Sequence, residues 1–343
     1  MSKIIRVGLA SFGMSGRVFH APFIANNPKF ELTAIVERHR NDSREKYPQT
    51  KLYRSYNELF ADKTIDLIVV NTPVQTHFEY AQKALLLGKN VLVEKPFTVN
   101  ASQAEELCRM SELNNCFLSV YQNRRYDGDF LKVKEIMQSG VLGNLKEVEI
   151  RFDRFRTEIS AKTHKEISEG SGALHDLGAH LIDQALQLFK MPKFVFADLG
   201  FFRQKTQTND YFEVILFYEN ELRVRLKSST IAKEKQWEYI LHGDKGSFLQ
   251  QRFDVQEEVL ARGLTPTTEY WLEKITLPNG ILHTDSKKET IAQHGNYMNF
   301  YEDLYQAIVH GKSNPVPSRQ ALNVMELIEK AQESFKKGMK ISV

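Results

Sequence analysis

Two parts of the sequence carry side chains that suit proton transfer and the stabilisation of negative charge. Lys95 follows the apolar run Asn90–Val93 and precedes Pro96, so its ammonium is expected at the end of a buried strand. Asp176 and His180 are four residues apart, a spacing that puts both on one face of a helix. A carboxylate near an imidazole raises the imidazole pKa and fixes its tautomer. His180 is then able to take a proton from a hydroxyl, and an ammonium such as that of Lys95 is able to stabilise an alkoxide.

The spacing of Asp176 and His180 also has plainer explanations. Asp183 lies on the same predicted helix face, and the apolar residues of the helix point away from it, which is also the pattern of a solvent-exposed face. That apolar stripe consists of Leu174, Leu177, Leu181 and Leu188. Histidine and carboxylates at helical spacing can also bind zinc, but no further ligand motif accompanies these three residues. We therefore expect no metal.

A glycine-containing turn follows the first apolar run of the chain. The sequence Ser11-Phe12-Gly13-Met14-Ser15-Gly16 matches a dinucleotide-binding turn in which serine replaces the first glycine. Gly13 would let the backbone approach a pyrophosphate, and Gly16 would let the helix pack closely on the strand. Helix N–H groups would then face the phosphates. We expect cofactor contacts from Ser11, Phe12, Gly13 and Met14; the alternative is an ordinary strand–helix turn.

The end of the second predicted strand gives conflicting signals about the nucleotide. Glu37 lies about 20 residues past the glycine turn, where an acidic side chain binds the ribose 2′-hydroxyl of NAD. Arg38, His39 and Arg40 follow at once, and such a basic cluster suits the 2′-phosphate of NADP. We assign Glu37 and Arg38 to the cofactor and leave NAD and NADP both open.

The apolar pattern divides the chain into two domains. Up to about residue 122, strands that are apolar on both faces alternate with helices, which predicts a parallel sheet covered on both sides. The expected strands are 4–9, 32–36, 65–70, 90–93 and 117–120, with helices at 78–87 and 101–114. From about residue 144 the apolar residues alternate with polar ones, which predicts a large, open, mostly antiparallel sheet. Its expected strands include 147–153, 194–202, 212–218, 222–227 and 237–241, followed by helices 297–309 and 320–336.

Composition excludes several classes of protein. The chain has 343 residues, 42% of them hydrophobic and 26% charged, which is typical of a globular protein. A net charge of +3 gives no indication of nucleic-acid binding. No apolar run approaches the roughly 18 residues of a membrane span, and two cysteines exclude a disulfide scaffold. We expect a soluble, cytoplasmic protein of two domains.

Several motifs in combination resemble those of the Gfo/Idh/MocA family of NAD(P)-dependent oxidoreductases. They are Glu94-Lys95-Pro96, the later Asp176-x-x-x-His180, Phe19-His20-Ala21-Pro22, Asn71-Thr72-Pro73 with His77, and the stretch from Tyr121 to Asp127. The resemblance covers nearly the whole chain. The segments around His20 and Arg124 look most similar to a branch resembling scyllo-inositol dehydrogenases.

This resemblance implies a fold and a set of site residues. Together with the strand pattern, it predicts an NAD(P)-binding Rossmann domain over 1–122 and a substrate-binding and oligomerisation α+β domain over 123–343; we expect the last helix to pack back on the first domain. It implies that Lys95 lies beside the nicotinamide, in a cis bond to Pro96, and that Asp176 and His180 complete the site. Thr72, Pro73, His77, Glu94 and Asn123 are then expected at the cofactor, and Arg124 at the substrate. A homodimer or homotetramer through the open sheet is also expected.

The resulting hypothesis is hydride transfer to or from a secondary alcohol carbon of a cyclitol, sugar or related polyol. The alternatives are an NAD(P)-binding regulatory or sensor protein without catalysis, and a reductase of a small carbonyl or aromatic diol. Arg154 and Arg156 are expected on a strand with Phe152, within reach of a sugar.

Overall fold

The computed structural model describes residues 3–159, 167–253, 255–266 and 279–343. These residues cluster into two compact units. The first comprises 3–123, 255–266 and 296–321, and the second comprises 124–253, 279–295 and 322–343. Each unit is described by itself.

The first unit contains a six-stranded parallel sheet in the order β3-β2-β1-β4-β5-β6. Its strands are β1 (Ile5–Leu9), β2 (Phe30–Val36), β3 (Lys51–Tyr53), β4 (Leu67–Val70), β5 (Asn90–Val93) and β6 (Leu118–Val120). Four of them, β1, β4, β5 and β6, are almost wholly buried because branched apolar residues occupy both faces. The predicted parallel sheet is confirmed. The sequence pattern missed β3, whose three residues are exposed or half-buried.

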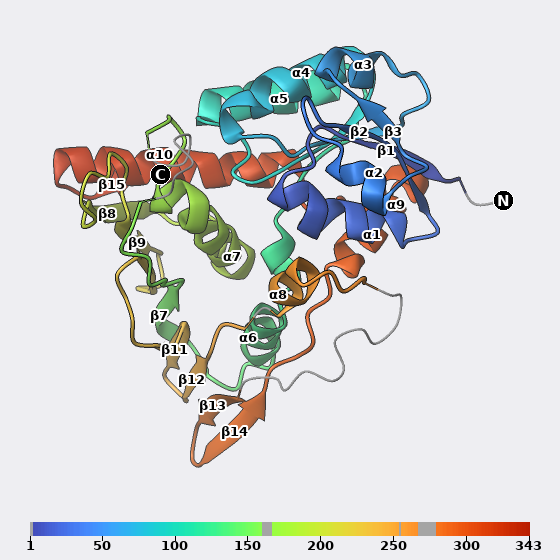
Figure 1. Ribbon diagram of the computed structural model, residues 1–343. Helices are drawn as coiled ribbons and strands as arrows, with labels where there is room; N and C mark the ends of the chain where they lie inside the picture. Colours follow the sequence, from blue (N-terminus) through green and yellow to red (C-terminus); the bar gives the residue numbers. More distant parts are fainter. Residues whose placement is uncertain (1–2, 160–166, 254, 267–278) are drawn as a thin grey trace. The chain divides into compact units, whose positions relative to one another are not determined.

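Helices cover both faces of this sheet. Figure 1 shows α3, α4 and α5 on one face and α1 and α9 on the other. The helical segments are η1 (Gly16–His20), α1 (Ala21–Ala25), α2 (Asp42–Lys46), α3 (Tyr56–Ala61), η2 (Val74–Thr76), α4 (His77–Leu86), α5 (Ala101–Leu113), α8 (Gln256–Ala261) and α9 (Met298–His310). The predicted helices at 78–87, 101–114 and 297–309 correspond to α4, α5 and α9.

The second unit is built on a nine-stranded sheet in the order β14-β13-β12-β11-β7-β10-β9-β8-β15. Among the described strands only β7 and β10 pair in parallel, so the sheet is mostly antiparallel, as predicted. The strands are β7 (Leu145–Arg151), β8 (Phe194–Gly200), β9 (Tyr211–Phe217), β10 (Arg223–Ser229), β11 (Tyr239–Gly243), β12 (Ser247–Gln250), β13 (Asn279–His283), β14 (Lys287–Ile291) and β15 (Ile341–Ser342). Because β7 ends at Arg151, the expectation that Arg154 and Arg156 lie on the strand is wrong; both follow it.

One face of this sheet is packed and the other is polar. Val148, Val224 and Leu226 are fully buried on the packed face, where α7 (Ala179–Phe189) contacts β7 and β10. The other helical segments are η3 (Asn123–Tyr126), α6 (Gly128–Gln138), η5 (Leu174–Gly178) and α10 (Ser318–Lys337); the chain passes from one unit to the other within η3 and α10. Among the described helices, none is both long and apolar enough to cross a membrane.

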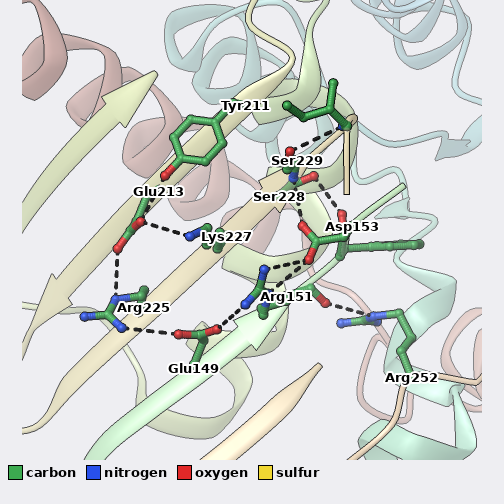
Figure 2. A network of polar contacts seen from close by, with 12 residues as sticks. Glu149, Arg151, Asp153, Tyr211, Glu213, Arg225, Lys227, Ser228, Ser229 and Arg252 are labelled. Atoms are coloured by element: carbon green, nitrogen blue, oxygen red, sulfur yellow. Dashed lines mark hydrogen bonds and ion pairs between the residues drawn. The ribbon is translucent and has the colours of Figure 1, made fainter. Parts of the chain in front are cut away.

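The polar face carries a ladder of ion pairs across β7, β10 and β9 (Figure 2). Arg225 lies in the middle, 3.2 Å from Glu149 and 2.9 Å from Glu213. Arg151 pairs with Glu149 at 3.2 Å on one side, and Lys227 with Glu213 at 3.6 Å on the other. These side chains are half-buried. Each of their charges has an opposite charge beside it on the same face.

Candidate active site

The glycine turn is held in place by a side chain from the next parallel strand. Asn71 follows β4, and its Oδ1 accepts the N–H of Ser11 at 2.9 Å while its Nδ2 donates to the Ser11 carbonyl at 2.8 Å. The Ser11 hydroxyl accepts the N–H of Gly13 at 3.2 Å. The serine that replaces the first glycine of the motif therefore stabilises the turn. The sequence predicted Asn71 only as part of the Asn71-Thr72-Pro73 motif, and this contact was not predicted.

The glycines of the turn fit a bound pyrophosphate. A Cβ at Gly16 would lie 2.4 Å from the Ser11 carbonyl oxygen, so only glycine allows the helix to start this close to β1. Within 4 Å, a Cβ at Gly13 would meet only the Ser11 hydroxyl oxygen, which would be 3.6 Å away. The backbone at Gly13 is thus open to a close approach, as a dinucleotide requires. Phe12 is buried edge-on against Tyr47, and Met14 is exposed.

Glu37 and Arg38 lie together at the end of β2. The buried Glu37 carboxylate accepts the N–H and the hydroxyl of Ser43 through Oε2, at 2.9 and 2.5 Å. Arg38 is exposed, and Arg40 pairs with Asp42 at 3.6 Å. An acidic and a basic side chain therefore stand at the same strand end, and the geometry is compatible with both NAD and NADP.

Glu94 connects the glycine-turn helix to the backbone of Lys95. Its Oε1 accepts the Ser15 hydroxyl at 2.5 Å and contacts His20 Nε2 at 3.0 Å, while its Oε2 accepts the Lys95 N–H at 3.0 Å. Burial alone would raise the Glu94 pKa, but the hydrogen bonds from His20 and Ser15 outweigh it and lower the pKa. His20 is itself fully buried, 2.8 Å from the Tyr301 hydroxyl. Glu94 is thus an ionised positioning group, and its partners Ser15 and His20 were not predicted.

His77 holds two main-chain segments of the site together. Its Nδ1 lies 3.0 Å from the Pro96 carbonyl and its Nε2 lies 2.9 Å from the Thr72 carbonyl. Burial lowers the His77 pKa, which favours the neutral ring. Because both ring nitrogens face main-chain carbonyls, we assign His77 a positioning role in place of the predicted cofactor contact. The Lys95–Pro96 bond is cis, as the family resemblance implied.

The predicted cofactor residues of the first unit follow the carboxyl ends of parallel strands. The turn follows β1, Glu37 follows β2, Thr72 and Pro73 follow β4, Glu94 and Lys95 follow β5, and Asn123 follows β6. The carboxyl ends of parallel strands meet at one edge of a sheet, where nucleotides bind in this architecture. Lys95 is half-buried, and the Thr72 hydroxyl is 2.7 Å from that of Thr76.

Asp176 and His180 lie on a helix of the second unit that begins with a π-helical turn. Asn209 fixes its start, because its carbonyl and its Oδ1 accept the N–H groups of Ala173 and Leu174, both at 2.7 Å. Asp176 lies in η5 and is exposed, whereas His180 lies in α7 and is buried. The two side chains thus differ in exposure, and their common side stays a prediction.

His180 and Asp183 are buried, so the solvent-face alternative is wrong for these two residues, whereas Asp176 is exposed. His180 is 4% exposed and Asp183 is 2% exposed. Asp183 accepts two hydrogen bonds from Arg125, at 2.6 and 2.8 Å. The predicted substrate residue Arg124 is also buried and donates to Asp127 at 3.1 Å. Among the described residues, no group of three His, Cys, Asp or Glu side chains could hold a metal ion.

Comparison with known proteins matches both parts of the chain to one family. Residues 5–122 match the NAD-binding Rossmann fold of the oxidoreductase family, and residues 134–343 match its C-terminal alpha/beta domain. Fold and glycine turn thus define an NAD(P)-binding oxidoreductase. The chain belongs to the Gfo/Idh/MocA family.

Relatives are similar over almost their full length. The uncharacterized oxidoreductase YdgJ of Escherichia coli is 39% identical, with 98% of each chain covered. The scyllo-inositol 2-dehydrogenase (NADP(+)) IolW of Bacillus subtilis is 33% identical over 97% of this chain and 94% of its own. A crystal structure of an oxidoreductase from Bacteroides fragilis is 43% identical, has a TM-score of 0.89, and covers 99% of this chain and 100% of its own.

Proposed function

We propose that this NAD(P)-dependent oxidoreductase transfers hydride to or from a secondary alcohol carbon of a cyclitol, sugar or related polyol. The observation that carries the proposal is the way Lys95 is held at the carboxyl end of β5. Glu94 accepts its N–H, and His77 contacts the carbonyl of Pro96, the next residue. These contacts fix the main chain on both sides of Lys95 and so pre-organise its ammonium. Electrostatic stabilisation of an alkoxide requires a pre-organised positive charge.

The cofactor would be held by the glycine turn, Glu37, Arg38 and the segments at Thr72, Pro73 and Asn123. When bound, the nicotinamide accepts or supplies the hydride. In the oxidation direction, His180 takes the proton of the substrate hydroxyl, and the Asp176 carboxylate supports the protonated imidazole. Lys95 stabilises the negative charge that develops on the substrate oxygen. Arg124 contributes to substrate binding.

The relatives support a polyol substrate. The printed name of IolW is scyllo-inositol 2-dehydrogenase (NADP(+)), and it is 33% identical to this chain over nearly its whole length. A cyclitol presents a secondary alcohol carbon, which is the chemistry assigned here to Lys95 and His180.

A nicotinamide absorbance assay tests the proposal. Purified protein is incubated with NAD⁺ or NADP⁺ and a panel of cyclitols, aldoses and alditols, and reduction is followed at the nicotinamide absorbance band. We expect turnover with at least one polyol. Tight binding of NADPH or NADH without turnover of any panel member would instead favour a sensor. Turnover confined to small carbonyls or aromatic diols would favour the reductase alternative.

We further propose that the chain self-associates through the polar face of the nine-stranded sheet. Beside the ion-pair ladder of β7, β10 and β9 lie half-buried apolar residues of β8 and β9, namely Phe194, Phe196, Ile215 and Phe217. A wide sheet face that carries both ion pairs and apolar side chains is able to pack against the same face of a second copy of the chain.

The cysteines favour a reducing compartment. Cys108 is buried and Cys116 half-buried, and both are free thiols. Burial raises the pKa of both thiols, which keeps them protonated and unreactive. We propose that the protein acts in the cytoplasm.

A further inference from the structure

Gln184 is a buried amide in the helix that carries His180. Both residues lie in α7, four positions apart, so their side chains are one helical turn apart on the same side of the helix. Gln184 is 0% exposed. A buried amide is stable only where its polar atoms have hydrogen-bond partners, so the partners of Gln184 indicate what it holds together.

The partners of Gln184 fix the direction in which its amide points. Its Oε1 accepts a hydrogen bond from Nη2 of Arg252 at 3.3 Å and lies 3.2 Å from the Tyr239 hydroxyl. Its Nε2 donates to the main-chain carbonyl of Arg124 at 3.3 Å. A guanidinium only donates and a carbonyl only accepts, so the amide oxygen must face Arg252 and the amide nitrogen must face Arg124.

A second contact joins the same two segments. Asp183, the residue before Gln184, accepts two hydrogen bonds from the side chain of Arg125, the residue after Arg124, at 2.6 and 2.8 Å. Consecutive residues of α7 thus contact consecutive residues of η3. Two neighbouring contacts restrain the orientation of a segment as well as its distance, so α7 sets the place of the Arg124 main chain.

The Arg124 guanidinium is restrained by contacts of its own. Its Nη1 donates to Asp127 at 3.1 Å, and its central carbon lies 4.9 Å from the centroid of the Phe152 ring. The guanidinium is therefore carried along with its main chain. A change at Gln184 is able to move Arg124 relative to His180 without altering either of these two side chains.

We propose that Gln184 is a positioning residue that holds Arg124 at a set place relative to His180. In the proposed function, Arg124 contributes to substrate binding and His180 takes the proton of the substrate hydroxyl. Both belong to the second unit. A substrate held by Arg124 meets His180 correctly only if their separation is fixed, and a displacement of about 1 Å can lower a rate about 100-fold. The inference rests on the proposed polyol dehydrogenase function and adds a residue to it.

Two substitutions separate the contact with Arg124 from the other contacts of Gln184. Gln184→Glu keeps an oxygen for Arg252 and Tyr239. It replaces the group that donates to the Arg124 carbonyl with a second oxygen, which the carbonyl repels. Gln184→Met removes all three contacts at a similar side-chain volume.

Kinetics with the best polyol from the panel test the inference. We expect KM to rise about 10- to 100-fold in both variants, because a displaced Arg124 holds the substrate less well. The Kd for NADPH should stay within about twofold of the wild type, since the glycine turn belongs to the first unit. The control is Gln187→Glu, which adds the same charge to the same helix at a half-buried position and should leave KM unchanged.

A merely structural role of Gln184 would give a different result. Partial unfolding lowers the fraction of active protein and therefore kcat, but the KM of the remaining folded molecules stays the same. An unchanged KM in Gln184→Glu, or a rise confined to Gln184→Met, would overturn the inference.

Hydrogen exchange distinguishes failure of the inference from failure of the proposed function, because it needs no substrate. In the full chain, the amides of η3 should exchange about tenfold faster in Gln184→Glu than in the wild type or in Gln187→Glu, since Arg124 is held less firmly. Equal exchange in all three proteins would overturn the inference. Faster exchange in Gln184→Glu, with no turnover of any polyol by the wild type, would support the contact of Gln184 with Arg124 and contradict the proposed function.

Discussion

Buried polar side chains near Lys95 are fixed by partners within the first unit. Glu94 is held ionised by Ser15 and His20, and burial favours the neutral ring of His77, whose nitrogens both contact main-chain carbonyls. Neither is free to move a proton during a reaction. Proton transfer therefore falls to residues outside these networks, which is why we assign it to His180 and charge stabilisation to Lys95.

The buried His175 should make stability depend on pH. Burial lowers its pKa from 6.5 to about 4. The unfolded chain therefore takes up a proton near pH 6.5, before the folded chain does, so the contribution of His175 to stability is lost as pH falls from about 6.5 to 4. The difference between the two pKa values corresponds to about 3 kcal/mol in the free energy of unfolding. Urea unfolding of the wild type and His175→Gln at pH 7 and pH 4.5 measures it; parallel changes in both proteins would contradict this account.

The Asp183–Arg125 pair should contribute strongly to stability. Both partners are buried, so Asp183→Ala leaves an uncompensated guanidinium and should lower the free energy of unfolding by about 3–5 kcal/mol. Glu333→Ala removes surface ion pairs with Lys330 and Lys337 and should lower the free energy of unfolding far less. Urea unfolding compares the two variants. Similar small losses would show that the buried pair is structurally unimportant.

At the scale of elements, the sequence predicted the strands that place the cofactor residues. Runs such as Leu67–Val70 are apolar on both faces and can only be buried strands, so their ends could be predicted to within two residues. β3 could not, because Lys51–Tyr53 is short and partly exposed. The hydrogen bonds between Asn71 and Ser11 and the contacts of Glu94 with Ser15 and His20 could not be predicted either. They join residues that are 60 to 79 positions apart in the sequence and that the sheet brings together.

Two alanine variants separate the structural and binding roles of the glycine turn. In Gly16→Ala the new Cβ meets the Ser11 carbonyl, so we expect a loss of about 1–3 kcal/mol in stability together with weaker NADPH binding. In Gly13→Ala the Cβ has space in the protein, so stability should change little while NADPH binding weakens at least tenfold. Thermal unfolding and fluorescence titration measure both quantities. Unchanged NADPH affinity in Gly13→Ala would contradict the assignment of this turn to the cofactor.

At the scale of the whole molecule, each unit gathers segments that lie far apart in the sequence. Residues 296–321 cluster with the first 123, although 172 residues separate them. The periodicity of apolar residues indicates local structure and cannot show such long-range association. The change from strands that are apolar on both faces to strands of alternating polarity, near residue 144, did predict two different sheets.

The polar face of the second sheet should hold copies of the chain together. We expect sedimentation velocity to give a mass of at least twice 39.7 kDa. Ile215→Asp places a charge among the apolar residues of this face and should yield monomers, whereas Leu113→Asp at the exposed end of α5 should not. Circular dichroism checks that both variants fold. A wild-type monomer would contradict the proposed self-association.

The central claim is that Lys95 acts on the reacting oxygen and is not needed to hold the cofactor. Removing such a group should lower kcat about 100- to 10,000-fold. With the best polyol from the panel, the decisive measurement is kcat for Lys95→Ala beside its Kd for NADPH, with Lys63→Ala, a change at an exposed turn, as the control. We predict the loss of kcat in Lys95→Ala alone, with the Kd within threefold of the wild type. A kcat near that of the wild type would contradict the account.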